Sequence, residues 1–234
     1  MSSLGLEPPI SRKFVLEFTK MSGAGNDFIV IDNRFYRFSG EELFTMAARF
    51  CPRRTGVGAD GLLSLQAADR EDVDFRMAYY NADGSLGTMC GNGARCIARF
   101  IAGDNADTDR VWKLAYPAGV ALARIQADGD VVVDMGAPNF EPASLPFVAE
   151  SQQDLYTVSV AGESVELAAV SMGNPHGVIE VEDVSTAPVE RLGPLLESHE
   201  RFPNRANIGF MQVVSPDRIR LRVFERGVGE TSAP

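Results

Sequence analysis

Residues 80–100 read YNADGSLGTMCGNGARCIARF, and this segment combines the end of a strand, a turn, a cysteine and the start of a helix. Just before it, apolar residues alternate with more polar ones at Phe75, Met77 and Tyr79, which predicts a half-buried strand. Later in the segment apolar residues recur at spacings of three and four, which predicts one face of a helix. These residues are Ala94, Ile97, Ala98 and Ile101, with Gly103 as the stop. Cys90 is therefore expected at or just before a helix N-terminus.

The position of Cys90 predicts two chemical properties. The first N–H groups of a helix lack internal partners and carry partial positive charge, so a thiol there is expected to have a lowered pKa. The same N–H groups can bind a carboxylate, and Gly91 and Gly93 let a ligand approach the backbone closely. A buried structural cysteine beside a glycine-rich turn is the alternative, because free cysteines are usually buried.

Composition excludes several classes of partner. The chain has 234 residues, of which 45% are hydrophobic, enough for one large domain or two small ones with a real core. A net charge of -10 and a pI near 4.7 argue against nucleic acid and against an anionic membrane surface. The apolar runs are too short to span a bilayer, and residues 1–10 lack the pattern of a signal peptide. A soluble protein is expected.

Cysteine and histidine content predicts neither disulfides nor a metal site. The three cysteines form no disulfide framework, so we expect a reduced, cytoplasmic protein in which Cys51 and Cys96 serve packing. The two histidines, His176 and His199, lie far apart and cannot complete a zinc site. No phosphate-binding or dinucleotide-binding motif is present, so no cofactor is expected either.

Taken in order, the first half of the chain predicts an alternation of strands and helices. Ser39 and Glu42 form a capping box at the start of a helix that Cys51-Pro52 ends, and residues 21–27 form a glycine-rich turn. Asp128-Gly129 predicts a hairpin turn. Strands are expected at 14–20, 28–31, 61–65, 75–79, 111–116, 120–126 and 130–135.

The second half repeats the first. Three segments match in the same order, which predicts a duplicated α/β unit. Gly25-Asn26 resembles Gly173-Asn174 at an offset of 148, the segment from Pro52 resembles that from Pro203 at 151, and the strand from Phe75 resembles that from Ile219 at 144. Carried forward, the last offset moves Cys90 to position 234, which is a proline.

The chain resembles the diaminopimelate epimerase family, which comprises two-domain isomerases that use no cofactor. The matching segments are Lys20–Phe28, Gly58–Gly61, Asn81–Gly84, Cys90–Cys96, Met172–His176, Pro203–Asn207 and Glu225–Thr231. The resemblance implies an α/β fold of two pseudo-symmetric halves, each a sheet wrapped around a central helix. The expected halves are residues 12–134, which carry Cys90, and residues 135–234.

The resemblance also implies a racemisation with two bases, in which one cysteine removes the α-proton of an amino acid and a second cysteine returns one from the opposite face. Cys90 would be one acid–base residue, and fixed dipoles would stabilise the carbanion in place of a pyridoxal ring. His176 and Glu225 would tune the cysteine pKa values. The implied substrate-binding residues are Asn26, Asn81, Gly91, Asn92, Asn174, Asn207, Glu225 and Arg226. Gly61, which is glutamine in some members, has no side chain to contribute.

One departure from the family pattern concerns the second cysteine. The family continues after Thr231 to a cysteine that this chain replaces with Pro234, so the second half is expected to be incomplete and the printed chain to epimerise poorly. The expected function is interconversion of LL- and meso-diaminopimelate for lysine and peptidoglycan precursors, in a monomer or a homodimer. Two alternatives stay open: a related racemase for another amino acid or hydroxyproline, and an amino-acid-binding fragment without catalysis.

Overall fold

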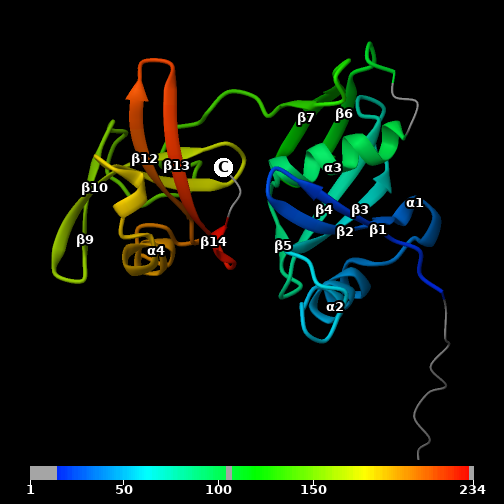
Figure 1. Cartoon of the computed structure of the whole chain (residues 1–234), viewed down its shortest axis with the longest axis horizontal. Helices are drawn as coiled ribbons and strands as arrows, with labels where there is room; N and C mark the ends of the chain where they lie inside the picture. Colours follow the sequence, from blue (N-terminus) through cyan, green and yellow to red (C-terminus); the bar gives the residue numbers. More distant parts are fainter. Residues whose placement is uncertain (1–14, 104–106, 232–234) are drawn as a thin grey trace, which may run out of the picture.

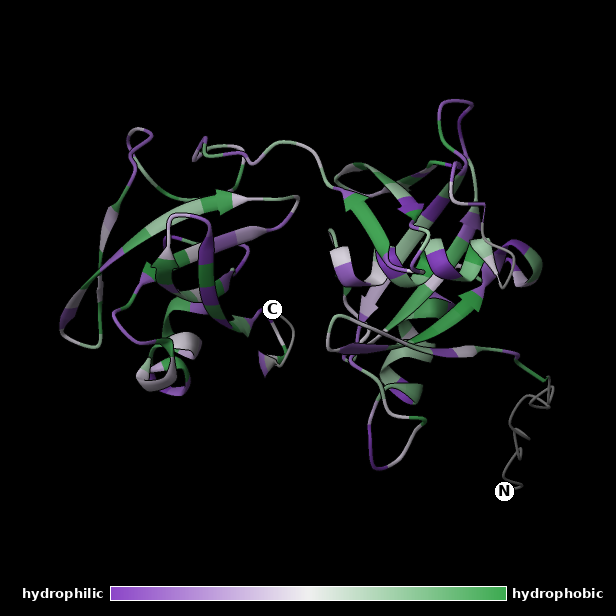
Figure 2. Cartoon of the chain, turned by 45° about the horizontal axis from the view of Figure 1, so that its top comes forward, coloured by the Kyte–Doolittle hydropathy of each residue, from purple (hydrophilic) through white to green (hydrophobic). Residues whose placement is uncertain are grey.

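The computed structural model describes residues 15–103 and 107–231, which form two β-sheets lying side by side with helices packed on them (Figure 1). The first sheet has eight strands and the second has six. Hydrophobic segments lie on strands of both sheets, and many connecting turns are hydrophilic (Figure 2). Two separate sheets agree with the duplication that the sequence predicts.

The first sheet has the strand order β1-β2-β3-β4-β6-β7-β8, with β5 paired to β4. Its strands are β1 (Thr19–Gly23), β2 (Asn26–Asp32), β3 (Gly61–Ala67), β4 (Phe75–Asn81), β5 (Leu86–Gly87), β6 (Trp112–Tyr116), β7 (Gly119–Ile125) and β8 (Val131–Asp134). Its helices are α1 (Asn33–Tyr36), α2 (Gly40–Phe50) and α3 (Gly91–Ala102). The helices α2 and α3 pack on opposite faces of the sheet, because α2 shares a core with Ile29 and Leu62 and α3 shares one with Val30 and Leu63.

The second sheet has the order β14-β13-β12-β11-β10-β9. Its strands are β9 (Tyr156–Val160), β10 (Glu163–Ser171), β11 (Pro175–Glu180), β12 (Asn207–Ser215), β13 (Arg218–Glu225) and β14 (Gly229–Thr231). The short 3-10 helix η1 (Val184–Thr186) and the helix α4 (Val189–Glu197) lie between β11 and β12 in the chain. The apolar face of α4 packs on Ile208 and Phe210 of β12.

The predicted internal repeat is confirmed by strand directions. In the first sheet β1–β2 is antiparallel, β2–β3 parallel and β3–β4 antiparallel, and the series β10 to β13 follows the same sequence of directions. The pair Tyr79–Gly87 in β4–β5 recurs as Val223–Thr231 in β13–β14, and both residues move by 144 positions. The sequence offset of 144 is therefore also a structural one.

Several local predictions are confirmed. Ser39 and Glu42 form both bonds of the capping box of α2, and the cap at the other end of that helix is Cys51. Cys90 is the N-cap of α3 and Gly103 is its C-cap. Cys51 and Cys96 are buried, as expected for packing residues.

The prediction of a strand at 14–20 followed by a turn at 21–27 is wrong in its boundaries, and residue 14 lies outside the described residues. The strand β1 begins at Thr19 and continues through Met21, and the turn contains only Ala24 and Gly25. Both turn residues have positive φ, 47° and 95°, which suits a two-residue hairpin. Such a tight turn allows both strands to continue up to it.

In the described ranges, every helix is too short or too polar to cross a bilayer.

Candidate active site

A cavity of about 350 Å³ lies between the two sheets and brings together all ten residues that the sequence singled out. The first sheet and α3 contribute Asn26, Asn81, Cys90, Gly91 and Asn92. The second sheet contributes Asn174, His176, Asn207, Glu225 and Arg226. These residues come from positions 26 to 226 of the chain, so only the packing of the two sheets makes them neighbours.

The site residues occupy equivalent places in the two sheets. Asn26 begins β2 after the β1–β2 turn, and Asn174 lies in the equivalent turn before β11. Asn81 ends β4, and Glu225 ends β13. The starts of β2 and β3 and the end of β4 meet at one end of the first sheet, and β11, β12 and β13 meet in the same way in the second, so each sheet presents its site residues at one end of its strands.

Cys90 is held by the first turn of α3. Its backbone is extended (φ -143°, ψ 102°), and its Sγ accepts a hydrogen bond from the Gly93 N–H at 3.2 Å. A Cβ on Gly93 would lie 2.7 Å from Leu63 Cδ2 and 3.3 Å from Cys90 Sγ, so residue 93 is small because the helix approaches β3 closely. The thiol thus takes the place of an N-capping oxygen.

The predicted lowering of the Cys90 pKa is wrong. Burial raises the pKa of this thiol to about 12, and the N–H groups of Gly93 and Asn92 oppose that shift without overcoming it. The nearby Glu225 carboxylate raises it further, because it disfavours a second negative charge. The physical reason is desolvation. The N–H groups at the helix N-terminus favour the thiolate, but burial removes the water that would solvate its charge, and this loss has the larger effect on the pKa.

The Asn26 amide connects β2 to α3. Its Nδ2 donates to Asp60 Oδ2 at 3.2 Å, and its Oδ1 accepts from Asn92 Nδ2 at 2.8 Å. Asn26 is only 5% exposed, so these bonds are important for a side chain that would otherwise be buried without partners. The turn-capping role that an asparagine usually has beside a hairpin therefore does not apply here.

Asn81 has a local role in addition to its place in the cavity wall. Its Nδ2 donates to Ser85 Oγ at 2.9 Å, across the turn from β4 to β5. Its backbone N–H and C=O also bond within that turn. The side chain supports the turn that leads to Cys90.

His176 is neutral in the second sheet. Its Nδ1 lies 3.0 Å from the Asn174 carbonyl, which makes Nδ1 the protonated nitrogen, and its Nε2 accepts from Asn207 Nδ2 at 3.1 Å. Asn207 Oδ1 in turn accepts from the Arg226 N–H at 2.9 Å. Burial and the Arg226 charge lower the pKa of His176.

Three residues of the site were missed as functional residues by sequence reasoning: Tyr79, Arg95 and Asp60. Tyr79 and Arg95 line the cavity, and Asp60 holds Asn26. A Cβ at Gly61 would lie 2.4 Å from the Tyr79 ring, so the ring occupies the space of a side chain at position 61. The signal was present, because all three belong to or adjoin the segments that carry the family resemblance, but pattern alone assigns them no role.

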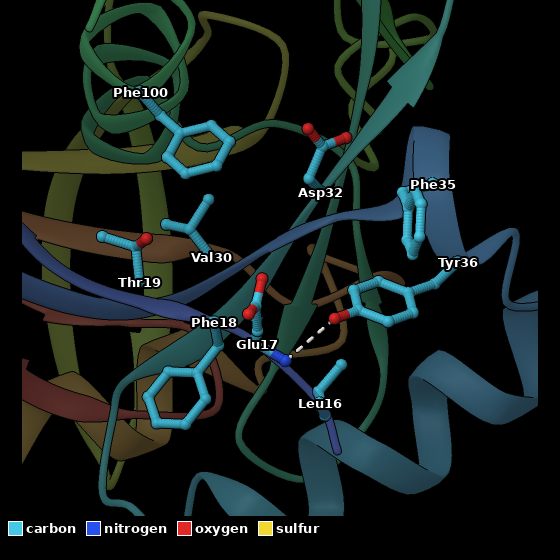
Figure 3. A pocket seen from close by; sticks show the side chains of 9 residues that line it. All are labelled: Leu16, Glu17, Phe18, Thr19, Val30, Asp32, Phe35, Tyr36 and Phe100. Carbon is cyan, nitrogen blue, oxygen red and sulfur yellow. Dashed lines mark hydrogen bonds between the residues drawn. The ribbon is translucent and has the colours of Figure 1, made fainter. Parts of the chain in front are cut away.

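A larger hollow of about 730 Å³ lies beside β1 and α1, away from these residues (Figure 3). Its walls include Phe18, Phe35, Tyr36 and Phe100, and the Tyr36 hydroxyl accepts from the Glu17 N–H at 2.9 Å. The Asp32 carboxylate in its wall is held by Arg34. This hollow contains neither Cys90 nor the asparagines, so size alone does not identify the site.

Within the described ranges, no group of three or more His, Cys, Asp or Glu side chains is arranged to hold a metal.

Comparison with known proteins agrees with the geometry. The family model described as diaminopimelate epimerase matches residues 18–141 and 168–234. The chain belongs to the diaminopimelate epimerase family. Membership places it among isomerases that act on a small molecule.

Relatives in this family are identical to the chain at nearly half of the aligned positions. The diaminopimelate epimerase of Pseudomonas paraeruginosa is 49% identical over 227 residues, which covers 94% of this chain and 79% of that protein. The diaminopimelate epimerase of Ectopseudomonas mendocina is also 49% identical, over 219 residues, with the same coverage of both chains. The chain therefore follows this family from the first sheet through the second.

Solved structures show the same fold at low identity. A hydroxyproline epimerase from Agrobacterium vitis matches with a TM-score of 0.63 and 13% identity, over 92% of this chain and 71% of that one. A protein described as a probable proline racemase from Agrobacterium radiobacter K84 matches with a TM-score of 0.66 and 14% identity, over 93% and 73%. Such identities show a shared mixed α/β architecture alone. The alternative of a hydroxyproline racemase is thus not favoured over the diaminopimelate epimerase function.

Proposed function

We propose that the chain interconverts LL- and meso-diaminopimelate, with Cys90 as an acid–base residue at the α-carbon. The observation that carries this proposal is the cavity between the sheets, where the thiol of Cys90 at a helix N-terminus meets five asparagines, two arginines and a glutamate. In this proposal the chain consists of two epimerase-like halves, residues 12–134 and residues 135–234, with the cavity between them. The relatives named diaminopimelate epimerase supply the substrate class.

Cys90 is suited to remove a weakly acidic proton. A thiol whose pKa is about 12 gives little thiolate at neutral pH, but each thiolate formed is a stronger base than an ordinary one. The ammonium group of a bound amino acid would bring a positive charge beside the sulfur and favour the thiolate. In this proposal, the substrate itself supplies a positive charge close to the sulfur.

The N-terminus of α3 is proposed to bind the α-carboxylate. The Gly91 and Asn92 N–H groups belong to the first helical turn and have no partner within the helix. A carboxylate at this position would spread the charge that develops when the α-proton leaves. Asn26, Asn81, Asn174 and Asn207 would hold the remaining polar groups, and Glu225 and Arg226 would hold the charged ones.

His176 and Glu225 are proposed to tune the cysteine pKa. Glu225 already raises the pKa of Cys90. The second acid–base residue is expected at position 234, which is Pro234 in this chain and lies outside the described residues. The proposal for this chain therefore concerns proton transfer at Cys90. No cofactor is required, since the carbanion would be stabilised by fixed dipoles.

The cellular setting belongs to the same proposal. We place the protein in the cytoplasm, where unpaired cysteines stay reduced and lysine precursors are made. The question of a monomer or a homodimer is decided by sedimentation of the purified chain, because twice the mass of 25.3 kDa is easily distinguished from the mass of one chain.

The test is exchange of the α-proton of diaminopimelate in heavy water, followed by the loss of its proton NMR signal. The thiolate of Cys90 removes the proton, the sulfur exchanges with solvent, and a deuteron returns to the same carbon. We expect the Cys90→Ala variant to exchange at least about 100-fold more slowly, because the base is gone.

The matched control is Cys96→Ala, in the same helix but buried on its inner face. It should keep most of the exchange rate at a cost of about 1 kcal/mol of stability. Exchange that survives in Cys90→Ala and disappears in Cys96→Ala would reject Cys90 as the base. Absence of exchange in the unmodified chain would reject the proposed activity for this chain.

A further inference from the structure

The amides of Asn26 and Asn92 belong to a row of hydrogen bonds that has one direction. Arg95 Nη1 donates to Asn92 Oδ1 at 3.2 Å. Asn92 Nδ2 donates to Asn26 Oδ1 at 2.8 Å. Asn26 Nδ2 donates to Asp60 Oδ2 at 3.2 Å. The row therefore starts at a guanidinium on α3 and ends at a carboxylate just before β3.

The two ends of the row determine how both amides are turned. An amide can rotate by half a turn, which exchanges its oxygen and its nitrogen, and only its partners decide between the two orientations. A carboxylate only accepts, so Asn26 must point its nitrogen at Asp60 and its oxygen at Asn92. A guanidinium only donates, so the oxygen of Asn92 must face Arg95. Reversing either amide would oppose donor to donor or acceptor to acceptor.

Asp60 is held in place by groups outside the cavity. Its Oδ2 also accepts from the Asp27 N–H at 3.0 Å, and its Oδ1 accepts from Arg53 Nη2 at 2.7 Å. Arg53 also bonds both oxygens of the Asp27 carboxylate. The paired starts of the parallel strands β2 and β3 thus fix the carboxylate before any ligand arrives.

We infer that Asp60 and Arg95 are positioning residues that turn the Asn26 and Asn92 amides so that they offer N–H groups, rather than oxygens, to a ligand in the cavity. Both amide oxygens are used inside the row, and each nitrogen keeps a second hydrogen. Both asparagines line the cavity beside the N-terminus of α3. The chemical class that fits such donors is a carboxylate, and this inference rests on the proposed function for the identity of that carboxylate.

The test compares Asp60→Asn with Asp32→Asn. Asp60→Asn keeps the shape but replaces one acceptor oxygen with a donor, so the Asp60 end of the row no longer dictates a direction and only Arg95 at the other end still does. Asp32 is the matched control, because its carboxylate is held by Arg34 at the far end of β2 and is not part of the cavity wall. Urea unfolding of both variants first establishes that they are folded.

The first measurement is the side-chain amide spectrum of the ¹⁵N-labelled chain without ligand, with Asn26→Asp and Asn92→Asp used for assignment. We expect Asp60→Asn to move both amide signals, because the bond of Asn26 to a carboxylate is lost and Asn92 is bonded to Asn26. Asp32→Asn should leave both signals in place. Unchanged signals in Asp60→Asn would overturn the inference without reference to any activity.

The second measurement separates binding from proton transfer. We expect Asp60→Asn to raise the Kd for diaminopimelate about tenfold, which is a cost of about 1.4 kcal/mol. The exchange rate at saturating substrate should fall by less than about threefold, because Cys90 is not part of the row. A Kd that stays within twofold of the unmodified chain would overturn the inference. If the unmodified chain does not bind diaminopimelate, the proposed function fails and the amide signals alone decide the inference.

Discussion

The two sheets carry a similar pattern of apolar residues on one face, with Gly209 in the place of Leu63, but within the described residues only the first sheet has a helix packed on that face. We call this the inner face. In the first sheet it carries Val30, Leu63, Leu65 and Met77, each at most 2% exposed beneath α3. The equivalent strand pairing in the second sheet gives Val178, Gly209, Met211 and Leu221. There Leu221 is 36% exposed, and Ile219 and Val213 beside it are 52% and 50% exposed.

This difference shows that strand pattern and burial are separate properties. Alternation along a strand decides which residues share a face, whereas the element packed on that face decides whether they are buried. The opposite face is covered in both sheets: α2 packs on it in the first sheet and α4 packs on it in the second. On the inner face of the second sheet, Val178, Leu221 and Val223 instead form an apolar wall of the cavity.

The largest effect is expected from a matched pair of truncations on the two inner faces. Met77→Ala should lower the free energy of unfolding by about 2–5 kcal/mol, because it leaves a hole beneath α3. Leu221→Ala, at the equivalent position, should cost less than about 1 kcal/mol, because its side chain is already partly in solvent. Urea unfolding measures both. Equal costs would mean that the second inner face is covered in solution.

A smaller effect is expected at the helices on the opposite faces. The Ser39 side chain caps α2 and takes part in the capping box, whereas Pro188 caps α4 without a side-chain hydrogen bond. Ser39→Ala should cost about 1 kcal/mol, since an N–H at the helix start loses its partner. Pro188→Ala removes no such bond and serves as the control. A Ser39→Ala variant as stable as the unmodified chain would show that the cap is not what stabilises α2.

The smallest effect is expected from mild acid, which should act on the second sheet first. Burial lowers the pKa of His176, so the unfolded chain binds a proton there at a higher pH than the folded chain does. The contribution of neutral His176 to the free energy of unfolding is therefore fully present above the usual pKa of 6.5, and it is lost as the pH falls below that value. Protonation would also displace the Asn207 amide that donates to the Nε2 of His176.

The first sheet should respond only to stronger acid. Bonds from Arg53 and Lys20 lower the pKa of Asp27 well below its usual 3.8, so its contribution is complete above that value and is lost below it. Hydrogen exchange read by mass spectrometry between pH 7 and pH 4 should show β11 and β12 losing protection while β2 and β3 keep theirs. In the His176→Gln variant, β11 and β12 should keep their protection above pH 4 as β2 and β3 do. Loss of protection that starts in β2 and β3 would contradict this order.

The sequence by itself determined the elements whose causes are local. The periodicity of residues 94–101, the Ser39–Glu42 capping box and the alternation in β4 each arise within a few residues, and all three are confirmed. The duplication was also readable, because its offset of 144 recurs in the pairing of β13 with β14. The boundaries of β1 could not be predicted from the sequence, because the short turn at Ala24 and Gly25 is defined by its backbone angles.

Only the tertiary structure decided the chemistry of the cavity. The pattern around Cys90 predicted a lowered pKa from the helix alone, but desolvation depends on what else surrounds the sulfur, and here it raises the pKa. The direction of the Asn26 and Asn92 amides depends on Asp60, 34 residues along the chain from Asn26. Burial and hydrogen-bond direction depend on distances between segments that are remote in sequence. A local pattern therefore identified which residues meet in the cavity, and the packing of the two sheets set their charge and orientation.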